Sequence, residues 1–224
     1  MTRHPRLLDA FCGEGGAGMG YHRAGFDVYG VDLSAKALRR YPFPSVRADA
    51  VWFIAEHGHE FDAIHASPPC KAHNDLQRQW KRDHPNLIPP TRAALISTGR
   101  PWVMENVEGA PLLDHLTLCG EAFQLGCTCN DGLYRPLRRH RLFESNAPLM
   151  SPGCACSHRQ PVGVYGNGGG GQMGRGYKGD LRESVEAIGV PWMSRAGVSQ
   201  SIPPAFTEFL GGQLLDHLAR AAAC

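Results

Sequence analysis

The sequence predicts an α/β protein in which a mostly parallel sheet carries helices on both faces. Strand-like and helix-like patterns alternate between residues 6 and 107, as they do in a chain of βαβ units. Glycine or polar side chains follow the apolar strand candidates, at the edge where an open parallel sheet binds its ligands. Because domains commonly hold about 100–200 residues, we expect one domain over residues 1–224.

Each expected strand or helix depends on its own local pattern. An apolar run over residues 6–11 ends in a glycine-rich turn, and a helix over residues 19–25 follows and is ended by a glycine. Ser34 is the expected N-cap of the next helix, and Pro89 and Pro90 suit the first turn of another. The other expected strands cover residues 27–32, 61–66 and 102–107, and the other expected helices cover residues 34–40, 87–98, 181–188 and 204–222.

Composition excludes several classes of protein. Hydrophobic residues make up 42% of the chain and charged residues 20%, which argues against global disorder. No apolar run approaches the roughly 18 residues that a membrane span needs, and no secretory signal is recognisable. A net charge of +2 does not by itself indicate nucleic-acid binding. We expect a monomeric cytoplasmic protein with no membrane contact, whose eight cysteines serve catalysis or metal binding rather than disulfides.

The glycine-rich turn after the first strand is the first candidate site. Gly13, Gly15 and Gly16 have no side chain, which lets a ligand approach their backbone closely. Asp32 ends the second strand, where its carboxylate can accept hydrogen bonds from both hydroxyls of a ribose. Asp49 comes after a further short strand that follows Asp32, at a position suited to an exocyclic amine. The pattern predicts an adenosine compound as ligand, and the alternative is a tight turn that binds nothing.

A rigid turn after the strand over residues 61–66 is the second candidate site. Cys70 follows Ser-Pro-Pro, and the two prolines stiffen the backbone that would present this thiol as a nucleophile. Glu105 lies near the end of the next expected strand, so its carboxyl group reaches the same edge, where burial would raise its pKa enough for it to donate a proton. The alternative for Cys70 is a small buried apolar side chain.

Together these motifs resemble one enzyme family. Residues 11–16 (FCGEGG), 68–70 (PPC) and 105–107 (ENV) have the order and approximate spacing found in DNA cytosine-5 methyltransferases. Residues 138–141 (RRHR) resemble the arginine motif with which that family contacts the target base. The similarity is to the minimal orphan enzymes encoded by phages and prophages. It continues in residues 181–189, which resemble the penultimate conserved helix, and in residues 199–203, which resemble the last motif beside the cofactor.

The resemblance implies a Rossmann-like methyltransferase fold, S-adenosylmethionine as methyl donor and double-stranded DNA as substrate. In this chemistry the Cys70 thiolate adds to carbon 6 of cytosine, which makes carbon 5 nucleophilic, while protonated Glu105 hydrogen-bonds ring nitrogen 3. Arg141 and Arg139 would hold the exocyclic oxygen of a base flipped out of the duplex. The expected cofactor contacts are Asp9, Phe11, Gly13, Gly15, Gly16, Asp32, Leu33, Asp49, Pro69 and Ser201.

The chain departs from the family in its target-recognition region. Between Arg141 and Leu181 lie 39 residues, where the family inserts a much longer domain. We expect residues 127–180 to form a small Cys/Gly-rich insert, so that the enzyme recognises a very short site, the insert selects it, or a partner protein supplies specificity. Residues 71–86 are basic and follow the nucleophile, and they either close over DNA or form a solvated amphipathic helix.

Two cysteine pairs flank the arginine motif. Cys127, Cys129, Cys154 and Cys156 provide four thiolates, which suit a tetrahedral zinc site, and His158 could replace any one of them. A metal would order an insert that is too short to bury a core of its own. The alternatives are free loop thiols or a disulfide. The arginines between the pairs either contact phosphate and base or form a solvated strand edge.

Two other functional hypotheses stay open at this point. A related enzyme could modify RNA, or transfer a group other than methyl from a modified sulfonium donor, with the same Cys70 and Glu105 chemistry. A hypothesis of another class is a non-catalytic DNA-binding regulatory subunit that keeps the fold. Intact Cys70, Glu105 and Arg141 argue against that hypothesis.

Overall fold

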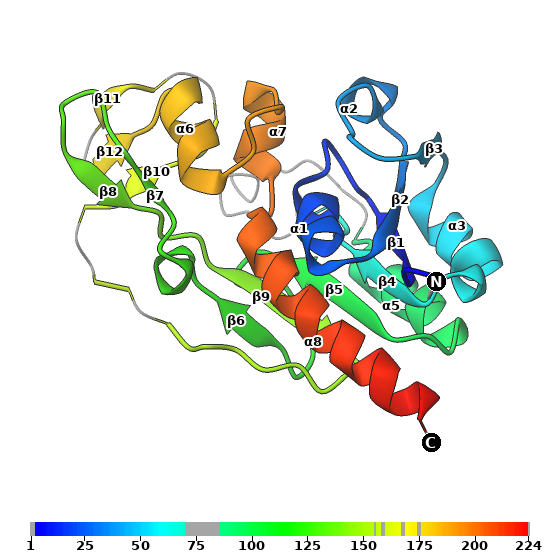
Figure 1. Ribbon diagram of the computed structural model, residues 1–224. Helices are drawn as coiled ribbons and strands as arrows, with labels where there is room; N and C mark the ends of the chain where they lie inside the picture. The colour runs from blue at the N-terminus through cyan, green and yellow to red at the C-terminus, as the bar shows by residue number, and fades with distance from the viewer. Residues whose placement is uncertain are drawn as a thin grey trace.

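The computed structural model describes residues 3–69, 86–154, 156–157, 160–166, 169–173 and 176–223. Its main feature is a seven-stranded sheet with helices on both faces (Figure 1). In spatial order the strands are β3 (Ser45–Arg47), β2 (Asp27–Asp32), β1 (Arg6–Ala10), β4 (Ala63–Ala66), β5 (Trp102–Asn106), β9 (Arg141–Ser145) and β6 (Leu116–Leu118).

Most of this sheet is parallel. The strands from β3 to β5 pair in parallel, whereas β9 is antiparallel to β5 and β6 is antiparallel to β9. The order of the chain reverses at β1, because β2 and β3 extend the sheet on one side of it and β4 and β5 extend it on the other. In open α/β sheets, ligands bind beyond the carboxyl ends of the strands at such a reversal.

Helices cover both faces of the sheet. α1 (Gly16–Ala24) packs against α8 (Pro204–Ala222), which crosses in front of the sheet in Figure 1. α3 (Ala50–His57) packs against α5 (Ile88–Ser97). In the part of the chain that the structure describes, no helix is both long enough and apolar enough to traverse a lipid bilayer. Other short elements are α2 (Ala35–Leu38) and the 3-10 turns η1 (Gly58–Glu60) and η3 (Gly120–Phe123).

Neighbouring residues of the parallel strands face two separate cores. Leu7 of β1 shares a core with α1 and α8, whereas Leu8 belongs to the core that includes α3 and α5. In β4, Ala63 likewise belongs to the first of these cores and Ile64 to the second. Both faces of these strands are buried, so apolar residues occur at consecutive positions, as is typical of parallel sheets, and Asp9, His65 and Glu105 are among the buried polar exceptions. The predicted fold class, a mostly parallel sheet with helices on both faces, is confirmed.

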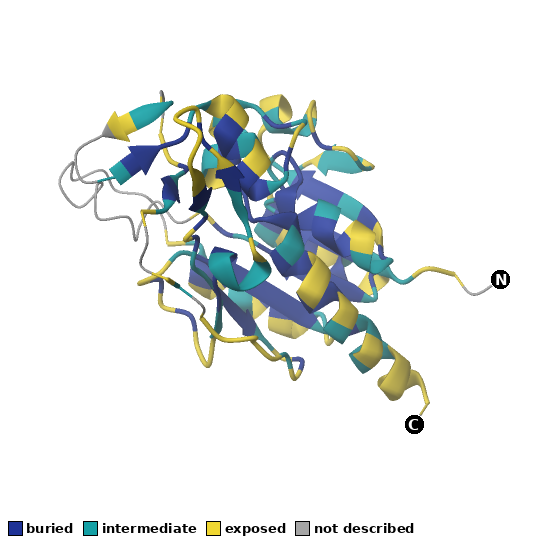
Figure 2. Cartoon of the chain, turned by 60° about the vertical axis from the view of Figure 1, so that its left-hand side comes forward, coloured by how far each residue is buried: buried dark blue, intermediate teal, exposed yellow. Residues whose placement is uncertain are grey.

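A smaller group of elements carries most of the expected insert. Its residues share a third apolar core, in which Cys127, Leu137 and Tyr177 pack with Ile188 and Val198. Figure 2 shows buried residues in this group as well as in the main sheet. The insert therefore packs on the two helices that follow it. The group consists of β7 (Gly126–Thr128), β8 (Tyr134–Pro136), β10 (Val162–Gly163), β11 (Gly171–Met173), β12 (Gly176–Lys178), α6 (Leu181–Ile188) and α7 (Arg195–Gln200) (Figure 1).

Two differences from the expected elements lie near the candidate site. α1 begins at Gly16 rather than at residue 19, because Gly15 caps it in the left-handed conformation (φ 90°) and the next glycines are part of the helix. A Cβ atom on Gly20 would collide with the backbone of Pro204, so this glycine lets α1 and α8 approach closely. No helix was expected over Ala50–His57.

Candidate active site

The glycine-rich turn connects β1 to α1 at the carboxyl edge of the sheet. Gly13 has a φ of 55°, and a Cβ atom there would meet nothing within 4 Å, whereas one on Gly16 would collide with the hydroxyl of Ser201. The space beside Gly13 is therefore open. At Gly16, the segment that follows α7 packs against the turn. Phe11 adopts a φ of 59°, rare for a residue with a side chain, where the chain leaves β1.

Asp32 lies beside this turn at the end of β2. Its Oδ2 accepts a hydrogen bond from the backbone amide of Gly13 at 2.9 Å, and its Oδ1 accepts one from the backbone amide of Ser34 at 2.7 Å. Each carboxylate oxygen can accept a further hydrogen bond, so the group is held in place but not saturated. The side chain of Leu33 is 61% exposed next to it, which offers an apolar surface beside a polar anchor.

Asp49 has a structural role that the sequence analysis did not assign to it. It is the N-cap of α3, and its Oδ1 accepts the amide of Trp52 at 2.9 Å. Asp is a favoured N-cap residue, so a local pattern could have predicted this helix. The residue is exposed, and its second oxygen can still accept a hydrogen bond from a ligand.

Asp9 is buried in β1. Its Oδ2 accepts the hydroxyl of Tyr41 at 3.0 Å, and its Oδ1 has no hydrogen-bond partner among the described residues. Burial raises the pKa of Asp9 to about 7, against a smaller opposing effect of the Tyr41 hydrogen bond. Among the expected cofactor contacts, Asp9 is thus a buried carboxyl group with unused acceptor capacity.

Buried Glu105 and half-buried Arg141 form an ion pair at the ends of β5 and β9. Arg141 Nε lies 2.9 Å from Glu105 Oε1, and Arg141 also donates to the carbonyl of His140 at 2.9 Å. Burial raises the pKa of Glu105, and the nearby Arg141 and Arg139 guanidiniums oppose this effect only in part. The structure therefore brings together two of the predicted catalytic groups, and burial favours the protonated form of the Glu105 carboxyl group.

Asn106 connects β5 to the turn that precedes Cys70. Its Nδ2 donates to the carbonyl of Pro68 at 3.0 Å, and its side-chain oxygen accepts the amide of Val107 at 3.0 Å. Pro69 is exposed and is the last described residue before the candidate nucleophile. Cys70 and the expected DNA clamp up to residue 85 lie outside the described residues.

Arg139 bridges the small group of elements to the site. This buried side chain donates to the carbonyl of Val164 at 3.2 Å and to the carbonyl of Ser199 at 3.0 Å. Both contacts are with backbone, so Arg139 holds the strands around β10 and the end of α7 against the sheet edge. Arg141 is the arginine that faces Glu105.

A chain of polar side chains, buried except for half-buried Ser67, leads to Glu105 and was not predicted from the sequence. The Tyr21 hydroxyl lies 3.1 Å from His65 Nδ1, and His65 Nε2 lies 2.7 Å from the Ser67 hydroxyl. Ser67 in turn hydrogen-bonds Glu105. Burial lowers the pKa of His65 to about 3, so the ring is neutral and can accept on one side and donate on the other. In the sequence, this chain of side chains was indicated by a histidine within the largely apolar run FDAIHA, residues 61–66.

Glu14 is a second residue whose role is visible only in the structure. Its carboxylate accepts the amide of Ser194 at 2.6 Å and the hydroxyl of the same residue, and its backbone carbonyl accepts the indole N–H of Trp192 at 2.7 Å. Ser194 is the N-cap of α7. Glu14 therefore fastens the glycine-rich turn to the segment between α6 and α7.

Solved structures of other proteins resemble this chain in fold. No family model matches the chain, and no curated protein matches its sequence. A candidate DNA modification methyltransferase encoded within a prophage of E. coli matches 96% of this chain and 99% of its own, with a TM-score of 0.61 at 14% identity. The fold is that of a Rossmann-like methyltransferase.

Two other solved structures match shorter stretches of this fold. The SAM-dependent methyltransferase from Agrobacterium tumefaciens matches 64% of this chain and 56% of its own, with a TM-score of 0.42 at 16% identity. The Dnmt2 methyltransferase of S. pombe matches 66% of this chain and 52% of its own, with a TM-score of 0.43 at 14% identity.

The cysteines expected to bind zinc lie in two different places. Cys154 and Cys156 gather with Cys119 and His140, and their ligand atoms all lie within 4.8 Å of one another. Cys127 and Cys129 are not part of this group. Their sulfurs lie 3.9 Å apart in the third apolar core, where burial raises the pKa of Cys127 to about 12. His158, the replacement ligand, lies outside the described residues.

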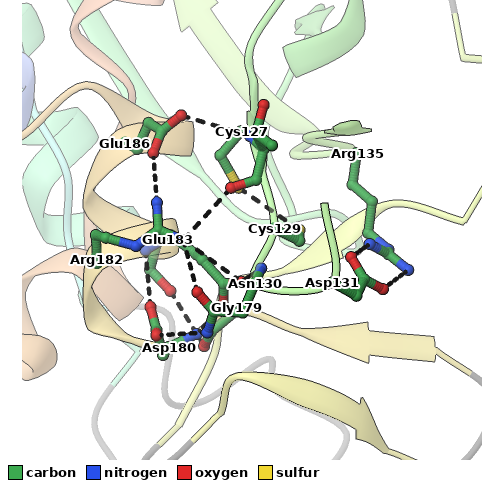
Figure 3. Close-up of polar contacts among 12 residues, drawn as sticks. Cys127, Cys129, Asn130, Asp131, Arg135, Gly179, Asp180, Arg182, Glu183 and Glu186 are labelled. Carbon is green, nitrogen blue, oxygen red and sulfur yellow. Dashed lines mark hydrogen bonds and ion pairs between the residues drawn. The ribbon is translucent and has the colours of Figure 1, made fainter. Parts of the chain in front are cut away.

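Polar contacts fasten the Cys127–Cys129 hairpin to α6 (Figure 3). Glu183 accepts the amide of Asn130 at 2.6 Å and forms a reciprocal capping box with Asp180. Arg182 donates to the side-chain oxygen of Asn130 at 2.7 Å. The hairpin is therefore held by α6 and by an apolar core, and these two thiols act as small buried side chains.

Proposed function

We propose that the protein transfers a methyl group from S-adenosylmethionine to carbon 5 of cytosine in DNA. The observation that carries the proposal is the pair of buried Glu105 and half-buried Arg141, which lies at the sheet edge where the turn toward Cys70 begins. Asp32 and the glycine-rich turn lie at the carboxyl end of neighbouring strands of the same sheet. The carboxyl edge of the sheet thus offers a site for the methyl donor and a carboxyl group that can donate a proton to a nucleobase.

The residues at the ends of β1 and β2 fit the adenosine part of the donor. Asp32 would bind the ribose hydroxyls through its remaining lone pairs, and Leu33 would contact the adenine ring. The open position at Gly13 lets a ligand approach the backbone. The donor supplies a methyl group on a sulfonium, and the protein residues bind it and exclude water from it.

Cytosine needs activation, because its carbon 5 does not attack a methyl group unaided. The Cys70 thiolate forms a bond to carbon 6, and the electron pair of the ring moves toward nitrogen 3, where the proton held by Glu105 stabilises it. Arg141 hydrogen-bonds the exocyclic oxygen. Carbon 5 would then bond to the methyl group as the methyl–sulfur bond breaks, and the donor would leave as its neutral thioether. Loss of the carbon-5 proton to a base then expels the thiolate and restores the ring.

Burial prepares Glu105 for this role. An ordinary glutamate is ionised near pH 7, but the raised pKa of Glu105 keeps a larger fraction of it protonated. Ser67 and Arg141 fix the orientation of its carboxyl group. Since the reacting atoms of a stacked base are inaccessible, the proposal includes flipping the target nucleotide out of the duplex.

A methylation assay with three substrates tests the proposal. The protein is incubated with labelled donor and with random duplex DNA, single-stranded DNA or transfer RNA, and the products are mapped by sequencing for 5-methylcytosine. We expect label in duplex DNA, at cytosine carbon 5, that disappears in Glu105→Ala. Label confined to transfer RNA would favour the RNA-modifying alternative, and duplex binding without label transfer in any arm would favour a non-catalytic DNA-binding subunit.

A further inference from the structure

Three thiols and one imidazole converge where β6 ends and β9 begins. Cys119 Sγ lies 3.1 Å from Cys156 Sγ, and His140 Nε2 lies 3.2 Å from Cys156 Sγ and 3.5 Å from Cys154 Sγ. Zinc–sulfur bonds of about 2.3 Å and zinc–nitrogen bonds of about 2.0 Å at tetrahedral angles separate ligand atoms by about 3.5–3.8 Å. Small shifts of these side chains would therefore produce a tetrahedral ligand set.

The fold itself places two of these ligands together. Leu118 of β6 pairs with Arg141 of β9, so the antiparallel ladder puts Cys119 opposite His140. The segment with the other two ligands is held at both ends. Ser151 donates its hydroxyl to the carbonyl of Thr117 at 2.7 Å, and the amide of Ser157 donates to Glu121 at 2.7 Å.

A carboxylate contacts the second ring nitrogen of the imidazole. His140 Nδ1 lies 3.0 Å from Oε1 of Glu108, on the side of the ring opposite the thiols. If Nδ1–H donates to Glu108, the lone pair of Nε2 points toward the sulfurs, which is the tautomer that binds a metal. Metal-binding histidines almost always donate their second ring N–H to a carboxylate or carbonyl in this way.

We propose that Cys119, His140, Cys154 and Cys156 bind one structural Zn²⁺ ion, with Glu108 orienting the imidazole. Four protein ligands close the coordination sphere, which is typical of a structural rather than a catalytic zinc site. His140 lies between Arg139 and Arg141. A metal there would fix the backbone at the start of β9, and so the guanidinium that faces Glu105. The proposal extends beyond the methyl-transfer function and does not depend on it.

Metal content tests the site without substrate. The full chain is expressed with zinc in the medium, purified under argon, and analysed by mass spectrometry of its elements. We expect about one zinc per chain. After replacement by Co²⁺, the absorption spectrum should show thiolate-to-cobalt charge transfer and the visible bands of tetrahedral cobalt. Absence of zinc together with absence of these bands would overturn the proposal.

Variants distinguish this ligand set from the other cysteine pair. Cys154 is exposed, so Cys154→Ser removes one ligand without disturbing a core, and it should lose most of the zinc. Cys127→Ala is the matched control, because it removes a thiol of the other pair and keeps a small apolar side chain; it should retain the metal. Glu108→Gln should weaken Zn²⁺ affinity by about tenfold or more, since it loses the carboxylate.

The reverse pattern, with zinc retained in Cys154→Ser and lost in Cys127→Ala, would show that the site belongs to the other pair. A Cys119–Cys156 disulfide, found by intact-mass analysis of protein kept under argon, would also overturn the proposal. A melting temperature measured for each variant, with and without added Zn²⁺, separates loss of the metal from loss of the fold, because stabilisation by Zn²⁺ requires the site.

Discussion

The side-chain amide of Asn106 donates a hydrogen bond to the backbone carbonyl of Pro68 at 3.0 Å. This contact joins the end of β5 to the turn after β4, and both residues are buried. It explains why an asparagine directly follows Glu105: one residue carries the carboxyl group, and the next one holds the neighbouring turn at a set distance from it.

Changing Asn106 should therefore affect catalysis more than donor binding. Asn106→Asp keeps the size of the side chain and the acceptor for Val107 but loses the donor to Pro68. We expect kcat to fall by about 10–100-fold, the scale of an effect that misplaces reacting groups, with an unchanged Kd for S-adenosylmethionine. Asn146→Asp is the matched control, because Asn146 makes similar contacts at the other end of β5. Equal losses in both variants would contradict a positioning role.

Cys70 should form a covalent adduct with DNA that contains 5-fluorocytosine. Fluorine at carbon 5 cannot leave as a proton does, so the thiol stays bound to carbon 6 after methyl transfer. We expect a band of protein–DNA adduct on denaturing gels with the natural chain and with the control Cys129→Ala. Cys70→Ala should abolish it. An adduct that persists in this variant would sink the assignment of the nucleophile.

Asp32→Ala should weaken donor binding by about 1.5–3 kcal/mol, the usual range for hydrogen bonds to a charged group. The variant also loses the contacts of Asp32 with Gly13 and Ser34, so part of the effect reflects a loosened turn. Calorimetry with S-adenosylmethionine measures the change. Asp27→Ala, at the exposed start of the same strand, is the control and should bind normally. Unchanged affinity in Asp32→Ala would refute the donor site.

Asp49 needs a substitution that keeps its role as an N-cap. Asp49→Ser retains an oxygen for the amide of Trp52, so we expect the free energy of unfolding to change by less than about 0.5 kcal/mol. If the second oxygen binds the adenine amine, affinity for the donor should fall about five- to tenfold. Urea unfolding and calorimetry measure the two effects separately. Normal donor affinity in this variant would leave Asp49 with its helix cap alone.

Asp9 should make the protein less stable as pH rises. Its pKa is about 7 when folded against 3.8 as the ordinary value, so between these limits the unfolded state loses its proton first and is favoured. The stability that protonated Asp9 contributes is fully present below pH 3.8 and is lost as the pH rises through 7. Asp9→Asn removes this dependence and should gain up to about 4 kcal/mol relative to the natural chain between pH 4 and pH 8. Urea unfolding of both proteins across this range, without donor, tests the sign; parallel stability curves would contradict it.

Local patterns were sufficient for much of the fold. Helices α6 and α8 have the predicted bounds, because Asp180 and Pro204 begin them and the apolar residues Phe206, Leu210 and Leu214 recur on one face of α8. The glycine-rich turn, Asp32 and Glu105 also lie at the predicted strand ends. Each of these features depends on residues that are close in the sequence, where periodicity and capping act directly.

Tertiary structure decided which distant residues meet. The spacing of Cys127, Cys129, Cys154 and Cys156 indicated one group, but the register of β6 against β9 brings Cys119 and His140 to Cys154 and Cys156. The same is true of the contacts from Ser67 and Arg141 to Glu105. The sequence by itself determined helices α6 and α8 and four strands of the parallel sheet, and it placed the glycine-rich turn, Asp32 and Glu105 at strand ends, since these features follow from short-range patterns. Partners across the sheet depend on strand pairing and core packing, which no local pattern specifies.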